Sequence, residues 1–168
     1  MSASDPGQHA PFYVVLNAGS GHDETQLRGS TIKDVLEQAG RTVHMEIVED
    51  GELLPDIAKR MAAAATAGGG ILVAAGGDGT INTVAHEAVL AGCPFGVLPQ
   101  GTFNYFGRAH GIPEDLADAA RALLTARVRP VQVGLVNGRV FLVNASVGLY
   151  PKLLEERESD KAQYGRSR

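Results

Sequence analysis

The chain has 168 residues, of which 44% are hydrophobic and 20% are charged, and its formal net charge at pH 7 is −4. This length suits one domain with its own core, and the composition excludes a largely disordered chain. The negative balance argues against a nucleic-acid-binding protein, which needs a basic surface. A single cysteine, Cys93, leaves no internal disulfide, as is typical of cytoplasmic proteins.

Residues 1–11 are expected to form a disordered tail. Their sequence begins MSASDPGQHA and has neither the basic nor the apolar region of a signal peptide. The most apolar run, residues 61–77, is interrupted by glycines and too rich in small residues to span a bilayer. We therefore expect a cytoplasmic protein whose membrane contact, if any, is peripheral and at the inner face of the membrane.

Strand-like and helix-like segments alternate between residues 12 and 126, which predicts a three-layer α/β/α domain around a parallel sheet. Apolar runs predict the strands, and apolar residues spaced i, i+3, i+4 and i+7 predict the helices. Asp23 is expected to cap the first helix. The expected strands are 12–16, 42–48, 71–75 and 95–98. The expected helices start near residues 23, 54, 81, 104 and 115.

The pattern changes after residue 126. Asn137 and Gly138 lie between the apolar runs 131–136 and 139–144, which predicts a β-hairpin with a type I′ turn. Because a two-residue turn requires antiparallel strands, residues 127–168 are expected to begin a second, mostly β domain that is truncated after this hairpin. The unpaired edge of such a hairpin offers a route to a homo-oligomer.

Three glycine-rich loops each follow a predicted strand. Right-handed crossovers place such loops along one edge of a parallel sheet, and ligands bind at that edge. We therefore expect the loops to line one crevice. They are residues 17–21 (NAGSG), 76–80 (GGDGT) and 99–104 (PQGTFN).

The strongest chemistry lies in residues 76–82, GGDGTIN. Glycines let backbone N–H groups approach an anion closely, and the N-terminus of the following helix adds partial positive charge. Thr80 offers a hydroxyl to a phosphate oxygen, and Asp78 places a carboxylate where a divalent cation would bridge it to that phosphate. The alternative is an ordinary strand-to-helix turn in which Thr80 is the N-cap.

The other two loops carry weaker signals. Residues 17–21 are also common turn formers, and Thr102 and Asn104 suit a nucleotide or a helix cap equally well. Phe103 and Phe106 are expected to pack rather than to bind a ligand. No loop contains the lysine of a Walker A motif or a complete G-x-G-x-x-G sequence, and the five histidines lack zinc-ligand spacing.

Taken in this order, NAGSG, GGDGTIN and GTFNYFGR (residues 101–108) resemble the catalytic domain of diacylglycerol-kinase-type lipid kinases. NAD kinases and phosphofructokinases share the GGDG element, whereas GTFNYFGR favours the lipid branch. The resemblance covers about residues 12–150. It implies a transferase of lipid metabolism and phospholipid biosynthesis, which moves the γ-phosphoryl group of ATP to a lipid hydroxyl, such as that of diacylglycerol, with Mg²⁺.

The resemblance also assigns site residues. Asp78 would be the catalytic residue, which orients Mg²⁺ directly or through water or takes the hydroxyl proton. The residues that would bind the nucleotide are Asn17, Gly19, Ser20, Gly21, Gly76, Gly77, Asp78, Gly79, Thr80, Asn82 and Thr102.

Some positions depart from the family pattern. Ala18 replaces a proline, and Tyr105 stands where many members have an aspartate, so the acceptor lipid is left open. Members also carry a second domain that supplies a magnesium site, a catalytic carboxylate and much of the lipid pocket. We therefore expect this chain to bind nucleotide and to have weak or no kinase activity alone. The alternatives are an NAD-kinase-like enzyme and a non-catalytic nucleotide-binding module.

Overall fold

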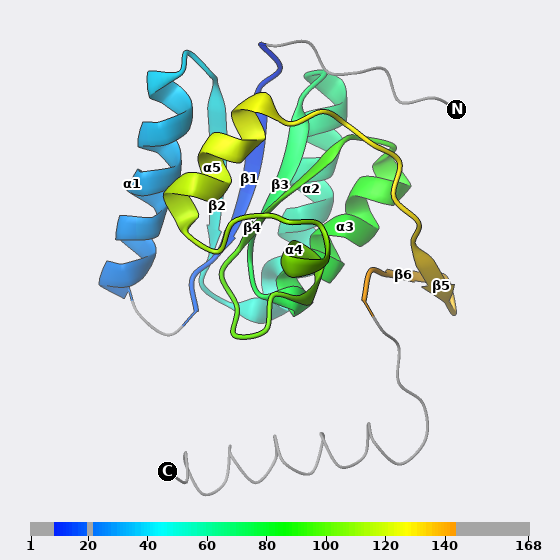
Figure 1. Ribbon diagram of the computed structural model, residues 1–168. Coiled ribbons are helices and arrows are strands. Elements are labelled where there is room, and N and C mark those ends of the chain that lie inside the picture. Colours follow the sequence, from blue (N-terminus) through cyan, green and yellow to red (C-terminus); the bar gives the residue numbers. More distant parts are fainter. Residues whose placement is uncertain (1–8, 20–21, 144–168) are drawn as a thin grey trace, which may run out of the picture.

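The computed structural model describes residues 9–19 and 22–143 (Figure 1). Its elements are β1 (Phe12–Asn17), α1 (His22–Gln38), β2 (Val43–Val48), η1 (Gly51–Leu53), α2 (Leu54–Ala67), β3 (Ile71–Gly76), α3 (Asp78–Ala91), β4 (Phe95–Pro99), α4 (Tyr105–Ala109), α5 (Leu116–Thr125), β5 (Gly134–Val136) and β6 (Arg139–Phe141).

Strands β1 to β4 form one parallel sheet in the order β2-β1-β3-β4. Figure 1 shows α1 and α5 on one face of this sheet and α2 and α3 on the other. The predicted three-layer α/β/α architecture is therefore confirmed. All four strands end at the lower edge of the sheet in this view, which is the edge expected to carry the ligand-binding loops.

The core lies in two layers, because β1 sends alternate side chains to opposite faces of the sheet. Phe12, Val14 and Leu16 pack in the layer formed with α1 and α5, while Val15 packs in the layer formed with α2 and α3. All four side chains are fully buried. Burial on both faces explains why the strands read as continuous apolar runs rather than as alternating ones.

Three local predictions need correction. Asp23 is not the cap of α1, since the helix already begins at His22 and Asp23 lies in its first turn. Thr80 is not the cap of α3, because the N-cap is Gly77 in an extended conformation. Residues 10 and 11 are not a disordered tail: Ala10 is buried, and the carbonyl of Pro11 accepts a hydrogen bond of 2.9 Å from the N–H of Ile71.

The antiparallel hairpin is confirmed, and its strands are shorter than predicted. Asn137 and Gly138 have φ angles of 49° and 76°, as a type I′ turn requires. The strands cover 134–136 and 139–141 because residues 131 and 132 are exposed and have no strand partner. Residues 144–168, where the second domain was expected to continue, lie outside the described residues.

Candidate functional site

The three loops expected at one edge of the sheet meet there. The side-chain amide of Asn17 donates a hydrogen bond of 2.8 Å to the hydroxyl of Thr80, which joins the end of β1 to α3. The N–H of Gln100 donates a bond of 2.8 Å to the carbonyl of Gly76, which joins the end of β4 to the end of β3. This follows from the sheet order, in which β3 lies between β1 and β4. Ser20 and Gly21 lie outside the described residues.

The first turn of α3 opens onto this edge without a side-chain cap. Gly77 is the N-cap and has no side chain to accept a hydrogen bond from the first N–H groups of the helix. An uncapped first turn leaves backbone donors unsatisfied, and the helix dipole adds positive charge at the same place. The arrangement suits an anionic ligand such as a phosphate group.

The glycines of these loops differ in whether the protein leaves room for a side chain at their positions. A Cβ atom on Gly76 would lie 2.7 Å from the Cβ of Thr80, and one on Gly101 would lie 2.7 Å from the Cα of Gly77. These two glycines are therefore required by close packing within the protein. A Cβ atom on Gly79 would meet no atom within 4 Å, and its φ angle is not in the left-handed region. Nothing inside the described protein requires a glycine at position 79.

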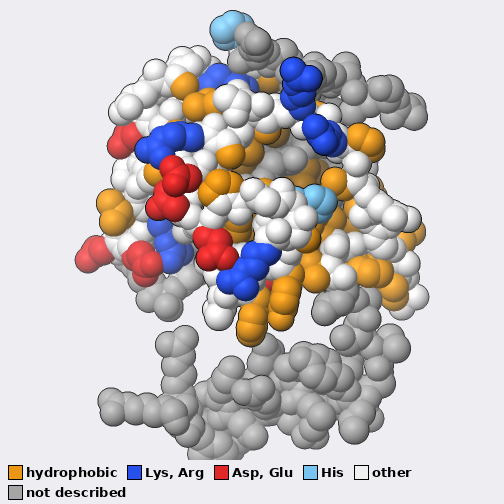
Figure 2. All heavy atoms as spheres, in the orientation of Figure 1, with side chains coloured by type: hydrophobic (Ala, Val, Ile, Leu, Met, Phe, Trp, Pro, Cys, Tyr) orange, Lys and Arg blue, Asp and Glu red, His pale blue; other side chains and the backbone are white. Residues whose placement is uncertain are grey.

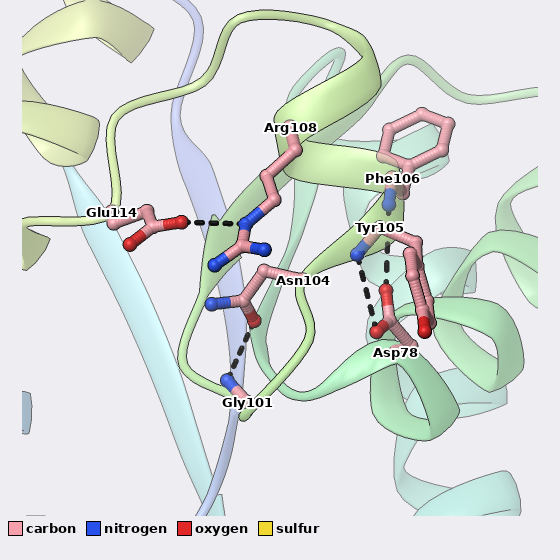
Figure 3. Close-up of polar contacts among 7 residues, drawn as sticks. All are labelled: Asp78, Gly101, Asn104, Tyr105, Phe106, Arg108 and Glu114. Atoms are coloured by element: carbon pink, nitrogen blue, oxygen red, sulfur yellow. Dashed lines mark hydrogen bonds and ion pairs between the residues drawn. The ribbon is translucent and has the colours of Figure 1, made fainter.

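The carboxylate of Asp78 joins α3 to α4 (Figure 3). Its two oxygens accept hydrogen bonds from the N–H groups of Tyr105, at 3.3 Å, and Phe106, at 3.4 Å. Asp78 thus satisfies the first donors of α4, which its own N-cap, Asn104, leaves without a side-chain acceptor. Sequence analysis missed this role because the partners are backbone groups 27 and 28 positions away.

Asn104 holds the loop before α4 in a tight turn. It has a φ angle of 50°, and its Oδ1 atom accepts a hydrogen bond of 2.7 Å from the N–H of Gly101 (Figure 3). An asparagine that bonds a nearby backbone group in this way is a recognisable turn signal in the sequence. Asn104 occupies the N-cap position of α4, but its side chain bonds Gly101 and makes no cap hydrogen bond to the helix, so the predicted cap bond is absent. Thr102 is exposed beside it.

Asn82 lies on α3 two residues after Thr80, and its side chain bonds the hairpin. Its amide nitrogen donates to the carbonyl of Val140 at 3.3 Å, and its Oδ1 atom accepts from the N–H of Leu142 at 3.1 Å. One turn further along α3, the Nδ1 atom of His86 accepts from the N–H of Val140 at 3.3 Å. Asn82 was grouped with the nucleotide-binding residues, yet both polar atoms of its side chain bind β6 and the residue after it.

A cation lies beside the first loop, which the sequence did not reveal. A Cβ atom on Gly19 would lie 3.8 Å from the Nη1 atom of Arg28, which projects from α1. Arg28 forms an ion pair with Glu24, one turn earlier on the same helix. The i,i+4 spacing of this pair was a visible signal, but the approach of Arg28 to Gly19 depends on where α1 packs.

Mg²⁺ is compatible with these residues, although they form no protein-only metal cage. Among residues 9–19 and 22–143, no three His, Cys, Asp or Glu side chains gather as a potential metal site. Magnesium commonly takes one or two carboxylates and completes its shell with phosphate oxygens and water. A single carboxylate, Asp78, beside an uncapped helix N-terminus is compatible with this kind of coordination.

A cavity of about 1340 Å³ lies along the outer edge of β4, the edge strand of the sheet formed by the described residues. Its lining is largely apolar, includes Phe95, Leu123 and Val131, and does not include Asn17 or Asp78. The cavity and the candidate phosphate site therefore have different linings, although Phe106, whose N–H bonds Asp78, lines the cavity. Within the described part of the chain, no helix has the length and apolar character needed to cross a bilayer.

Comparison with known proteins identifies the family. The sequence model described as the diacylglycerol kinase catalytic domain matches residues 11–136, which is most of the chain. The chain belongs to the diacylglycerol kinase catalytic domain family. Residues 11–136 include all three loops, so the resemblance carried by NAGSG, GGDGTIN and GTFNYFGR is confirmed.

Curated members of this family cover more sequence than the chain does. It is 41% identical over 128 residues to a protein named "Probable lipid kinase YegS-like" from Pseudomonas aeruginosa, a match that covers 73% of this chain and 40% of that protein. It is 45% identical over 86 residues to a diacylglycerol kinase from Bacillus subtilis, covering 49% of this chain and 28% of the relative. The chain thus spans less than half the length of these relatives.

Solved structures of the diacylglycerol kinase family share the fold. A crystal structure of a diacylglycerol kinase from Bacillus anthracis matches with a TM-score of 0.68 and 25% sequence identity. The match covers 79% of this chain and 45% of that kinase. The parallel sheet and its helices are therefore the arrangement found in solved diacylglycerol kinases.

Proposed function

We propose that this chain is the nucleotide-binding part of an ATP-dependent lipid kinase that transfers the γ-phosphoryl group of ATP to a lipid hydroxyl, such as that of diacylglycerol. The observation that carries the proposal is the bare Gly79 in the uncapped first turn of α3. Among the residues that the structure describes, no packing contact and no backbone strain account for a glycine there. A ligand that must approach the backbone closely does account for it.

In this proposal the phosphate groups lie over the first turn of α3, against the N–H groups of Asp78, Gly79 and Thr80. Thr80 is buried, and its hydroxyl accepts from Asn17, so Asn17 acts by fixing this turn as well as by bordering the nucleotide. Gly19, Ser20, Gly21 and Thr102 line the remaining border, with Gly76 and Gly77 beneath the phosphates. Arg28 adds positive charge near Gly19.

Asp78 is the residue that would hold Mg²⁺, together with the nucleotide phosphates. When bound, the ion neutralises phosphate charge during phosphoryl transfer. The protein's own contribution is positional: Asp78 is fixed against Tyr105 and Phe106, so its carboxylate has a set place beside the first turn of α3. Catalysis of phosphoryl transfer depends mainly on such positioning and on charge neutralisation.

The lipid acceptor is proposed from the relatives. The proteins matched here are named as a lipid kinase and as diacylglycerol kinases. In the proposed reaction the lipid hydroxyl gives up its proton to solvent, its oxygen bonds to the γ-phosphorus, the bond from that phosphorus to the β–γ bridging oxygen breaks, and ADP leaves. We assign the complete reaction to a kinase as long as these relatives. This chain spans 40% of the Pseudomonas protein.

Nucleotide binding can be tested on the 168-residue chain by thermal unfolding with ATP, ADP or NAD, each with and without Mg²⁺. A ligand at about 100 times its Kd should raise the free energy of unfolding by about 2.7 kcal/mol. We expect ATP and ADP with Mg²⁺ to stabilise the chain and NAD to have no such effect. Stabilisation by NAD instead would support an NAD-kinase-like enzyme and contradict the lipid-kinase proposal.

Gly79→Ala tests the phosphate site without harming the fold. Alanine favours a helix over glycine by about 1 kcal/mol, so this variant should be as stable as the wild type or more stable. Its methyl group would stand where the phosphate approaches, so the stabilisation by ATP should be lost. Gly51→Ala is the matched control, because a Cβ atom there also meets nothing within 4 Å. Equal ATP responses in both variants would mean that the phosphates bind elsewhere.

A further inference from the structure

Two exposed aromatic side chains stand beside the candidate site. Phe103 is 59% exposed and Tyr105 is 51% exposed. Their rings stack on each other, with centroids 5.4 Å apart and planes inclined by 6°. Figure 2 shows hydrophobic side chains projecting from the lower edge of the molecule near α4, where the loops after the strands lie. We call Phe103 and Tyr105 the aromatic pair.

The aromatic pair departs from the expectation that the phenylalanines of GTFNYFGR pack inside. Phe106 is buried as expected, whereas Phe103 is not. With Asn104 in the left-handed conformation between them, residues 103 and 105 turn their rings to the same outer side and stack. Large aromatic rings exposed together are costly in water, which marks such a patch as an interaction surface.

The backbone under the aromatic pair is held firmly. Asn104 accepts a hydrogen bond from Gly101, and Asp78 accepts one from the N–H of Tyr105. Two rings on a fixed backbone lose little conformational freedom when they enter a new environment. The same bonds place the rings directly beside Asp78, which we propose holds Mg²⁺.

The charges around this edge are balanced or negative. Arg28 is paired with Glu24, and Arg108 with Glu114 at 2.7 Å (Figure 3). Two further exposed acidic residues follow the end of β2 on the same edge, namely Asp50 and Glu52. Within residues 9–19 and 22–143, this edge therefore carries no excess of positive charge that would attract an anionic surface. An aromatic ring with a polar tip suits the interfacial region of an uncharged membrane surface instead.

We propose that the aromatic pair, Phe103 and Tyr105, docks this edge of the domain onto a zwitterionic lipid surface. The inference rests on the proposed lipid-kinase function, since a lipid hydroxyl is presented at the membrane surface and the edge that carries Asp78 must face it. The contact is weak because only two rings take part. Weak contact allows the kinase to leave the surface after each turnover.

Tryptophan fluorescence provides the test, because the chain contains no tryptophan. Phe103→Trp introduces a single reporter into the aromatic pair. We expect its emission to shift to the blue when phosphatidylcholine vesicles are added, and brominated phosphatidylcholine to quench it. Leu90→Trp is the matched control: Leu90 is 67% exposed near the far end of α3, away from this edge, and its reporter should not respond.

Vesicle sedimentation measures the contribution of the pair itself. Phe103→Ala/Tyr105→Ala should weaken the binding to phosphatidylcholine vesicles about tenfold, and Leu90→Ala should leave it unchanged. Adding phosphatidylserine to the vesicles should not strengthen the binding. The proposal is overturned if the wild type does not sediment with the vesicles, if the double variant binds as the wild type does, or if binding requires phosphatidylserine.

Thermal unfolding with ATP on the same proteins separates this inference from the proposed function. Stabilisation by ATP without vesicle binding would overturn the docking role and leave nucleotide binding intact. Vesicle binding without stabilisation by ATP would overturn nucleotide binding and leave the docking role intact. If the double variant lost its ATP response but kept its vesicle binding, the rings would serve a nucleobase, and the docking proposal would be wrong.

Discussion

The amide of Asn17 and the hydroxyl of Thr80, 63 positions apart, are joined by a hydrogen bond of 2.8 Å. Asn17 is the last residue of β1, and Thr80 lies in the first turn of α3. Thr80 is only 5% exposed, so this bond is largely shielded from water. It sets the separation between the two loops that we propose border the nucleotide.

Replacing Thr80 by valine should destabilise the protein. Valine has nearly the same volume but no hydroxyl, so the amide of Asn17 would lose its partner in a partly buried site. The expected loss is about 1–3 kcal/mol in the free energy of unfolding, measured by urea denaturation. Thr80→Ser keeps the hydroxyl and should retain the bond. A double-mutant cycle with Asn17→Ala should show coupling of at least about 0.5 kcal/mol, and strictly additive losses would contradict the pairing.

Asp78→Asn should separate the structural and the ionic roles of this residue. Asparagine keeps one oxygen that can accept from the first N–H groups of α4, so we expect the free energy of unfolding to stay within about 1 kcal/mol of the wild type. The charge is lost, so the part of the ATP response that depends on Mg²⁺ should disappear, while any response in EDTA should remain. Thermal unfolding with ATP, with Mg²⁺ or with EDTA, measures both.

Asp78→Ala is the complementary variant. It removes both acceptors and should destabilise α4 by about 1 kcal/mol, the usual cost of a lost helix cap. If Asp78→Asn responded to ATP and Mg²⁺ as the wild type does, the carboxylate would be a cap for α4 and would have no role with the metal ion.

The sheet could be predicted from the sequence because each of its strands is locally distinct. Residues 12–16 and 71–75 are apolar runs that end in glycine-rich loops, and the helices between the strands keep their apolar spacing. Right-handed crossovers then decide the edge on which the loops lie. The meeting of Asn17 with Thr80 is a consequence of these rules, since β1 and β3 are neighbours.

The contacts that hold α4 and the hairpin could not be predicted in the same way. Asp78 bonds the backbone of residues 105 and 106, and Asn82 bonds the backbone of residues 140 and 142. A backbone partner leaves no mark in the sequence, because every residue except proline offers the same groups. The exposure of Phe103 was missed for a related reason: it depends on the left-handed backbone of Asn104.

Asn82→Ala should loosen the hairpin while leaving the parallel sheet intact. The variant removes both bonds from Asn82 to β6 and the residue after it, and leaves His86 as the remaining side-chain acceptor there. Hydrogen exchange at the N–H groups of Val140 and Leu142 should become about tenfold faster, which corresponds to about 1.4 kcal/mol. The control is Thr83→Ala, because the Thr83 hydroxyl bonds the Gly79 carbonyl within its own helix. Unchanged exchange at both positions in Asn82→Ala would show that the hairpin is held by other contacts.

Cys93 should react slowly with alkylating reagents at neutral pH. Burial raises the pKa of its thiol, and a hydrogen bond with Thr66 opposes this only in part. At a given pH near 8 the folded chain therefore holds less thiolate than the unfolded chain, whose thiol has a pKa of about 8.5. The folded chain should be labelled by iodoacetamide more slowly than the urea-unfolded chain, as followed by mass spectrometry. Equal rates at pH 8 would contradict a raised pKa.

The same shift gives stability a pH dependence of known sign. Below the pKa of the unfolded thiol, both states keep the proton and Cys93 has no effect on the slope. Above it, the unfolded chain releases the proton first, so the free energy of unfolding falls as the pH rises toward and through the folded pKa. Because other groups titrate in this range, the measurement is the difference between the wild type and Cys93→Ala. From about pH 8 upward, the free energy of unfolding of the wild type should fall relative to that of Cys93→Ala. If the wild type instead gained stability relative to the variant in this range, the pKa of the folded thiol would be lowered rather than raised.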